Sequence, residues 1–179
     1  DPQRRAIYVA TGNGYSEPAT QTGDAVIAFD MDTGAIRWIN QPSGKDVWAG
    51  GCRANDKTNP NCPSELGTDF DFSASPMLVK RTDGRDVLIV QQKSGMAFAF
   101  DPDNKGALVW QYRTSAGGGM GGQWGSAADG RQAYFSVNGT AGKNRGGMRA
   151  VKIDTGEEVW SKEAAERLCG TMRGCSAAQ

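Results

Sequence analysis

Four side chains that could bind a ligand or take part in catalysis lie in short polar segments of the first part of the chain. They are Asn13 between two glycines in TGNG, Asp69 and Asp71 in DFDFSASP, and Lys93 in QQKSGMAFAFD. An amide oxygen and carboxylates are ligands that a hard cation such as Ca²⁺ takes, and a lysine ammonium is a compact charge for an anionic group. Simpler interpretations exist: a left-handed turn residue, two solvated loop aspartates and a surface lysine at a hairpin tip.

A glycine-rich segment, GGGMGGQWGSAADG, carries two further candidates, Gln123 and Trp124. It lacks the Lys-Ser/Thr ending of a P-loop, so a phosphate is not needed to explain its glycines. The chain has no histidine, which excludes histidine-based triads, histidine-ligated zinc and CxxCH haem attachment within it. Lys and Arg balance Asp and Glu at 20 each, without a basic run, and we expect no nucleic-acid partner.

The ends and the apolar runs bear on the cellular setting. Apolar runs are only a few residues long, so we expect no membrane span in this segment. The chain opens with DPQRRAIYVATG, without Met or a leader-like pattern, and we expect it to be part of a longer protein.

The four cysteines, Cys52, Cys62, Cys169 and Cys175, lie in Gly/Pro/Asn-rich or terminal segments. No pair has CxxC spacing, which disfavours a zinc site built from all four thiolates. Three disulfide connectivities are possible, and the short loops 52–62 and 169–175 are the simplest; free thiols are the alternative. Surface disulfides favour an oxidising compartment.

The chain is organised by a repeat. AFDMDTGAIRW, AFDPDNKGALVW and AVKIDTGEEVW each read as a strand, a turn with Asp and Gly, and a strand ending in a tryptophan, at Trp38, Trp110 and Trp160. Ser-Ala echoes at 73–74, 126–127 and 176–177 recur about every 50 residues, the period of four-stranded propeller blades. We interpret the three tryptophans as packing residues between neighbouring blades.

These patterns predict an all-β fold of antiparallel propeller blades. The first blade lacks its opening strand and the others are complete, with strands at 7–11, 25–30 and 36–39; at 75–80, 87–92, 96–101 and 109–112; and at 124–127, 133–137, 148–153 and 158–160. Blade strands would then occupy 1–41, an insertion loop 42–68, blades 73–113 and 123–161, and a disulfide loop with the start of a next blade 162–179. A propeller closes with roughly four to eight blades, so the chain is expected to form an open, partial propeller.

The repeated A-x-x-x-D-T-G-x-x-x-W hairpin resembles the blade signature of the quinoprotein alcohol dehydrogenases, which are propellers of eight blades carrying pyrroloquinoline quinone (PQQ) and calcium. YVATGNGYSEPAT, NPNCP, DFDFSASP, QKSGMAFAFDPD and LCG…GCSAAQ are most similar to the members that act on polyvinyl alcohol. The resemblance spans essentially all 179 residues but covers only about three of the eight blades.

The resemblance implies a role for each candidate. Asn13 would be a calcium ligand, and Asp71 a calcium ligand and the general base. Asp69 is the runner-up for the base, because Asp-Phe occurs twice and the loop 42–68 is longer than in simple alcohol dehydrogenases. Lys93 would donate to the quinone oxygens, and Gln123 and Trp124 would touch the cofactor, although many family members carry Asn where this chain has Gln123.

The implied activity is the oxidation of secondary alcohols, polyvinyl alcohol among them, by hydride transfer to PQQ in the periplasm, with an electron acceptor such as cytochrome c. The rest of the site would lie in other blades, so the isolated segment is expected to be inactive. The alternative is a non-catalytic propeller scaffold of the outer-membrane assembly type. A scaffold needs the tryptophan hairpins but does not need Asn13, Asp71, Lys93 and Trp124 in one place.

Overall fold

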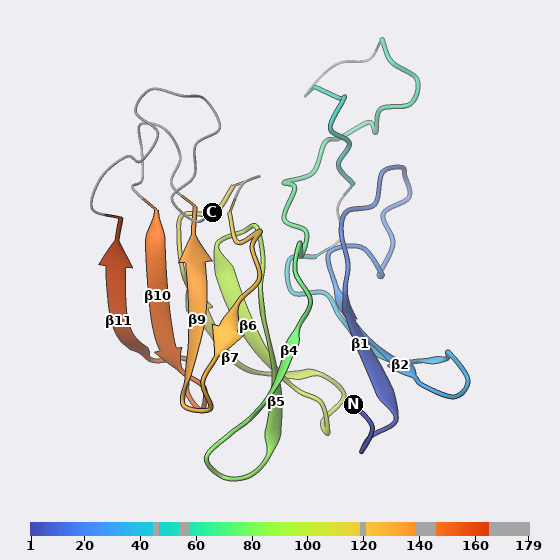
Figure 1. Cartoon of the computed structure of the whole chain (residues 1–179). Helices are drawn as coiled ribbons and strands as arrows, with labels where there is room; N and C mark the ends of the chain where they lie inside the picture. The colour runs from blue at the N-terminus through green and yellow to red at the C-terminus, as the bar shows by residue number, and fades with distance from the viewer. Residues whose placement is uncertain (45–46, 54–57, 119–120, 139–145, 165–179) are drawn as a thin grey trace.

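A computed structural model describes residues 1–44, 47–53, 58–118, 121–138 and 146–164, and within these ranges all regular secondary structure is β-strand. Three antiparallel sheets stand side by side (Figure 1). The first is β1 (Ala6–Ala10), β2 (Val26–Asp30) and β3 (Ile36–Asn40). The second is β4 (Met77–Lys80), β5 (Asp86–Gln91), β6 (Met96–Asp101) and β7 (Ala107–Arg113). The third is β8 (Ala127–Ala128), β9 (Gln132–Val137), β10 (Gly147–Lys152) and β11 (Glu158–Glu163).

The predicted fold class, blades of antiparallel strands in an open arc, is confirmed. The prediction is least accurate for β8, which is expected at 124–127 but pairs with β9 only through Ala127 and Ala128. Trp124 instead donates its ring N–H to Asn138 Oδ1 at 2.8 Å, which holds the preceding segment in a loop. The expected start of a next blade, at residues 176–179, lies outside the described residues.

The second sheet is buried on both faces, and this explains the continuous apolar run of β5. Val87 and Ile89 belong to one core cluster, shared with the third sheet, whereas Leu88 and Val90 belong to another, shared with the first. Side chains alternate between the two faces of a strand, so a strand between two neighbours must be apolar at every position. In contrast β9 alternates between half-buried and buried residues.

Each sheet repeats one packing unit around its tryptophan. Trp38, Trp110 and Trp160 pair across the ladder with Ala28, Ala99 and Ala150, and each ladder shifts register directly after that alanine. The ring of each of the first two tryptophans lies against a hairpin glycine of the next sheet. A Cβ on Gly106 would lie 2.6 Å from the Trp38 ring, and one on Gly156 would lie 2.7 Å from the Trp110 ring. Trp38 and Trp110 therefore join neighbouring sheets, as predicted for packing residues, whereas Trp160, on the last described sheet, is 39% exposed.

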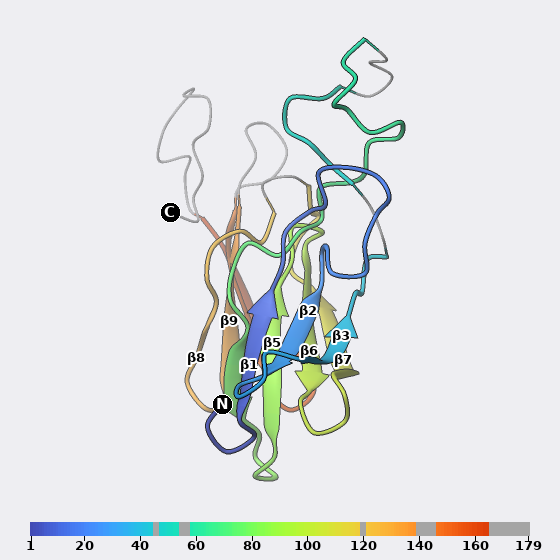
Figure 2. The ribbon, with the colours of Figure 1, turned by 90° about the vertical axis from the view of Figure 1, so that its right-hand side faces the viewer.

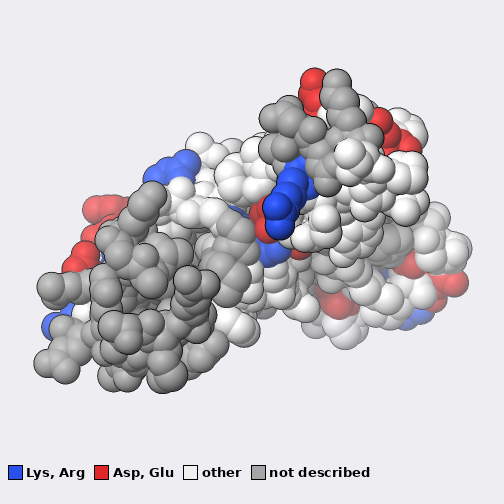
Figure 3. Space-filling model, turned by 90° about the horizontal axis from the view of Figure 1, so that it is seen from above, with Lys and Arg blue, Asp and Glu red and all other residues white. Residues whose placement is uncertain are grey.

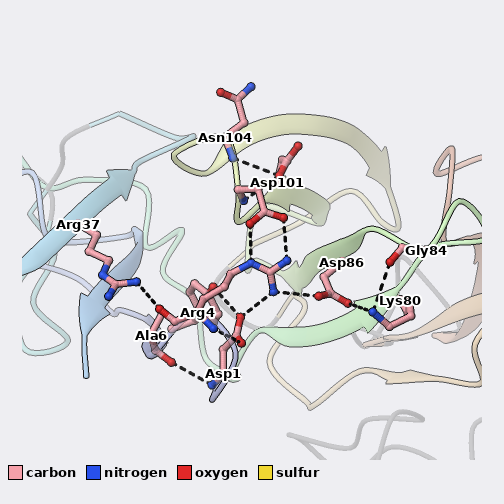
Figure 4. A network of polar contacts seen from close by, with 11 residues as sticks. Asp1, Arg4, Ala6, Arg37, Lys80, Gly84, Asp86, Asp101 and Asn104 are labelled. Carbon is pink, nitrogen blue, oxygen red and sulfur yellow. Dashed lines mark hydrogen bonds and ion pairs between the residues drawn. The ribbon is translucent and has the colours of Figure 1, made fainter. Parts of the chain in front are cut away.

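An ionic network joins the first two sheets at their lower ends in the view of Figure 1. The Arg4 guanidinium lies 2.9 Å from Asp1 and 2.8 Å from Asp86 (Figure 4). It also lies 2.7 Å from Asp103, which it contacts through two nitrogens. Two parallel N–H···O bonds fix the planar guanidinium more tightly than one. The network therefore ties the N-terminal segment to the two hairpins of the second sheet.

The long connection between the first two sheets contains the predicted Cys52–Cys62 disulfide, which the structure confirms. The predicted Cys169–Cys175 pair lies outside the described residues. Among the described residues there is no helix long and apolar enough to cross a membrane.

Candidate functional site

Three equivalent strands bring the polar loops to one end of the arc. Strands β5 and β9 are second in their four-stranded sheets, and β1 is the first strand of the three-stranded sheet, whose opening blade strand is missing. All three run toward the upper end in Figure 1. Asn13, Lys93 and Asn138 follow within three residues of the ends of these strands. Figures 1 and 2 both show the loop after β1 and the long connection before β4 above this end. The repeat of the fold thus places polar residues from distant parts of the sequence together.

Four of the predicted site residues form one connected cluster. Lys93 Nζ lies 3.0 Å from Asp69 Oδ1 and 2.6 Å from Asp71 Oδ1, the latter as an ion pair outside regular hydrogen-bond geometry. Asn13 Nδ2 donates to Asp69 Oδ1 at 2.8 Å. The cluster is secluded, because the side chains of Lys93, Asp69 and Asp71 are only 13%, 11% and 16% exposed. Seen from above, basic and acidic atoms meet near the middle of this end (Figure 3).

The two carboxylates determine the charge state of Lys93. Burial alone would lower its pKa, but contacts with Asp71 and then Asp69 outweigh that effect, and the pKa of Lys93 is raised. Lys93 is therefore a permanent cation at neutral pH. A cation held between two carboxylates is fixed in place and can donate a hydrogen bond to a polar partner.

The alternation of DFDFSASP explains how the aspartates reach the cluster. Phe72 is buried in the core between the first two sheets, and its N–H donates to Thr11 O at 3.1 Å. Lys93 N donates to Asp71 O at 3.2 Å, so this segment is clamped between the ends of β1 and β5. Asp69 adopts a φ of 60°, an uncommon conformation that Asp tolerates better than most residues.

Close backbone packing accounts for the glycines of the second candidate segment. A Cβ on Gly121 would lie 2.4 Å from Lys93 O, and one on Gly122 would lie 2.4 Å from Gln92 O. The segment before Gln123 and Trp124 therefore packs directly on the backbone that carries Lys93. Trp124 is 37% exposed and is bonded to Asn138. The structure thus brings this segment to the same end of the arc, with Trp124 held by the third sheet.

The donor set fits a calcium ion in part. Asn13 Oδ1 is buried and accepts no hydrogen bond from the described residues, so this oxygen is available to a cation. Together with the two carboxylates it provides oxygen donors of the kind Ca²⁺ takes. Among the described residues no three His, Cys, Asp or Glu side chains are grouped to hold a metal ion. A six- to eight-coordinate ion would therefore need ligands beyond Asn13, Asp69 and Asp71.

Two residues of the site were not singled out from the sequence. The Trp48 ring centroid lies 6.0 Å from Lys93 Nζ, at the limit of a cation–π contact. Asn138 binds Trp124. No local pattern marks Trp48, because the residues around it have no periodicity. Asn138 could have been found from its place directly after β9, close to the place that Lys93 has after β5.

Three sheets joined by tryptophan–glycine contacts, with a polar cluster at one end, define an arc of a β-propeller. No family model matches the chain. Over 90% of its length it is 43% identical to a polyvinylalcohol dehydrogenase of Sphingopyxis sp. (strain 113P3), and over 94% it is 40% identical to one of Pseudomonas sp.. A glycerol dehydrogenase large subunit of Gluconobacter thailandicus is 28% identical over 56% of the chain.

The chain is thus homologous to a segment of polyvinylalcohol dehydrogenases, and the resemblance predicted from its sequence is confirmed. It spans about a quarter of the length of these curated relatives, 25% and 26%. Solved structures with similar folds include BamB from Moraxella catarrhalis, with a TM-score of 0.45, 20% identity and coverage of 89% of this chain and 39% of that one. A europium-containing methanol dehydrogenase has a TM-score of 0.48, 17% identity and coverage of 90% and 28%. Neither score reaches 0.5, so the fold assignment rests on the strand pairing and the repeat.

Proposed function

We propose that this chain supplies part of the active site of a PQQ- and calcium-dependent alcohol dehydrogenase that oxidises secondary alcohols, with polyvinyl alcohol as the substrate. The observation that carries the proposal is the cluster of Asn13, Asp69, Asp71 and Lys93, in a chain homologous to polyvinylalcohol dehydrogenases. These residues come from three loops that only the fold brings together. A scaffold would need the blades but would not need this convergence.

The chain's own residues would act as follows. Asn13 Oδ1, a buried acceptor, and the carboxylate of Asp71 would hold Ca²⁺, and Asp69 would support Asn13 through their hydrogen bond. Lys93 would hold the anionic cofactor by its permanent charge. When bound, PQQ with Ca²⁺ supplies a two-electron acceptor for the hydride of the carbinol carbon.

The proton of the alcohol needs an acceptor in the chain. We assign this role to Asp71, with Asp69 as the runner-up, because both carboxylates belong to the cluster and their side chains are only 16% and 11% exposed. A positioned general base contributes about 10²–10⁴-fold to a rate. Gln123 and Trp124 would contact the cofactor from the glycine-rich segment that packs on Lys93.

The setting of the whole protein is part of the proposal. A periplasmic location is supported by the Cys52–Cys62 disulfide, since such bonds persist in oxidising compartments. Electrons would leave to an acceptor such as cytochrome c.

The test is a dye-linked assay of the full-length protein with a secondary alcohol, with and without PQQ and Ca²⁺. We expect turnover that requires both and that is lost when a chelator removes Ca²⁺. Correctly folded protein without any such turnover, and without PQQ binding by calorimetry, would refute the dehydrogenase proposal and favour a scaffold.

A further inference from the structure

The connection between β3 and β4 is anchored to the site at several points. Gln41 Nε2 donates to Thr20 O at 3.0 Å and to Gly23 O at 2.7 Å, and Ser43 Oγ donates to Gln92 Oε1 at 2.7 Å. These bonds fix the start of the connection against the loop after β1 and against the end of β5.

The middle of the connection is fixed as well. Val47 is buried and forms a parallel bridge with Gly14, directly beside Asn13. Trp48 N donates to Gly14 O at 2.9 Å, and Gly67 N donates to Val47 O at 2.7 Å. The two ends of the segment 47–67 therefore meet at Val47, next to the candidate calcium ligand.

Two further contacts restrain the outer part of this segment. The Cys52–Cys62 disulfide closes it internally, and the Glu17 carboxylate accepts hydrogen bonds from the backbone N–H and the hydroxyl of Ser64. These bonds with Ser64 lower the pKa of Glu17, so the contact is charged at neutral pH. The described parts of the segment, 47–53 and 58–67, thus form a wall that is restrained against the loop after β1.

Trp48 is the aromatic residue that this wall presents to the cluster. Its ring centroid is 6.0 Å from Lys93 Nζ, its backbone is held by Gly14, and it is only partly buried. A Cβ on Gly50 would lie 3.4 Å from the far edge of the indole, so this edge packs close to Gly50. A large apolar face therefore lies within one side-chain length of two carboxylates and an ammonium.

We propose that Trp48 is a specificity-determining residue that covers the carbon chain of the alcohol while the hydroxyl group reaches the Asp69–Asp71–Lys93 cluster. This inference rests on the proposed function and extends it to the substrate. The face of a tryptophan ring suits a chain of alternating CH₂ and CHOH groups, because such a chain offers methylene groups to the ring and hydroxyl groups to polar partners. Small alcohols, which lack the flanking methylenes, have little to gain from the ring.

The experiment compares Trp48→Ala, Trp48→Phe and, as a matched aromatic control, Tyr15→Ala in the full-length enzyme loaded with PQQ and Ca²⁺. Tyr15 follows Gly14 on the neighbouring loop and is 71% exposed. Substrates are 2-propanol and an oligomer of vinyl alcohol. Each shielded pair of methylenes is worth about a tenfold change in binding, so Trp48→Ala should raise KM for the oligomer about tenfold. The rise in KM for 2-propanol should be much smaller than the rise for the oligomer, and Trp48→Phe should restore most of the affinity for the oligomer.

A second readout separates this inference from the proposed function. Calorimetric titration of the cofactor-free full-length protein with the same oligomer should show about tenfold weaker binding for Trp48→Ala than for the wild type. An equal rise in KM for both alcohols, an equal effect of Tyr15→Ala, or unchanged oligomer binding would overturn the role of Trp48. Absence of alcohol oxidation by the wild-type enzyme, with oligomer binding still sensitive to Trp48, would instead refute the dehydrogenase proposal alone.

Discussion

The tryptophan–glycine contacts make a graded prediction about stability. Gly34, Gly106 and Gly156 occupy the same position in the three hairpins, with φ values of 71°, 70° and 70°. A Cβ on Gly34 would have nothing within 4 Å, whereas one on Gly106 or Gly156 would enter the ring of a tryptophan in the preceding sheet. Alanine at the three positions therefore imposes the same backbone strain but different crowding.

The magnitudes follow from the two effects. The left-handed conformation costs an alanine about 1–2 kcal/mol, which is the expected loss for Gly34→Ala. Overpacking adds about 1–3 kcal/mol at the other two sites. Trp110 is 7% exposed and its ring N–H is bonded to Ile153 O at 2.7 Å, so it has less room to move than the half-buried Trp38. We expect Gly156→Ala to be the most destabilising change, Gly106→Ala the next and Gly34→Ala the least.

The assay is urea unfolding of this chain, followed by tryptophan fluorescence and fitted with a common slope, since a shared slope means that stability alone has changed. Gly156→Ala should lower the free energy of unfolding by about 2–5 kcal/mol and Gly34→Ala by about 1–2 kcal/mol. Equal losses at the two positions would show that the tryptophan contacts do not join the sheets, and the account of the blade interface would be wrong.

Three further changes test other contacts. Arg4→Met should destabilise the chain by about 1–3 kcal/mol by leaving its aspartate partners unpaired. In the same unfolding assay the loss should shrink in high salt, and no loss at all would mean that the Arg4 network does not hold the first two sheets together. Burial, and then the hydrogen bond to Glu158, raises the pKa of Tyr112 to about 12; the folded chain holds this proton more tightly than the unfolded chain, so stability present below pH about 10 should be lost as the pH rises toward 12. The pKa values of Tyr8 and Tyr134 are also raised, so a spectrophotometric titration is compared with that of Tyr112→Phe. The variant should lose the phenol that titrates near pH 12, and a phenol that still titrates near pH 12 would contradict the assignment. Replacing Cys52 and Cys62 by Ser should cost up to about 2–3 kcal/mol, measured by thermal unfolding, and an unchanged midpoint would mean that this segment opens before the sheets do.

The regular part of the fold could be predicted from the sequence because its signals are local. The span 96–101 matches β6 to the residue, since apolar alternation and the Asp-Gly turn are both visible in the chain. The repeat also gave the grouping of strands into blades. A strand was predicted at 124–127, but its late start at Ala127 was not, because the partner that holds Trp124 in a loop, Asn138, follows a different strand.

The candidate site could be predicted only in part, because contacts between distant loops leave no local signal in the sequence. Asn13, Asp71 and Lys93 were found through motifs, but their ion pairs depend on loops that the sheets bring together. Asp69 was predicted only as the runner-up for the base, yet its side chain contacts both Lys93 and Asn13, whereas that of Asp71 contacts Lys93. Trp48 had no signal of its own, since its position depends on a single bridge between Val47 and Gly14.

The central claim is that the polar cluster at the upper end performs chemistry, and the turnover of two matched variants tests it most directly. In the full-length enzyme with PQQ and Ca²⁺, Asp71→Asn should retain cofactor but lose about 10²–10⁴-fold in kcat for a secondary alcohol, because an amide can still offer an oxygen to a cation but cannot accept a proton. Asp69→Asn, one Asp-Phe unit earlier, should retain most of its turnover. The opposite pattern would transfer the role of the base to Asp69, and wild-type kcat in both variants would contradict a catalytic role for the cluster.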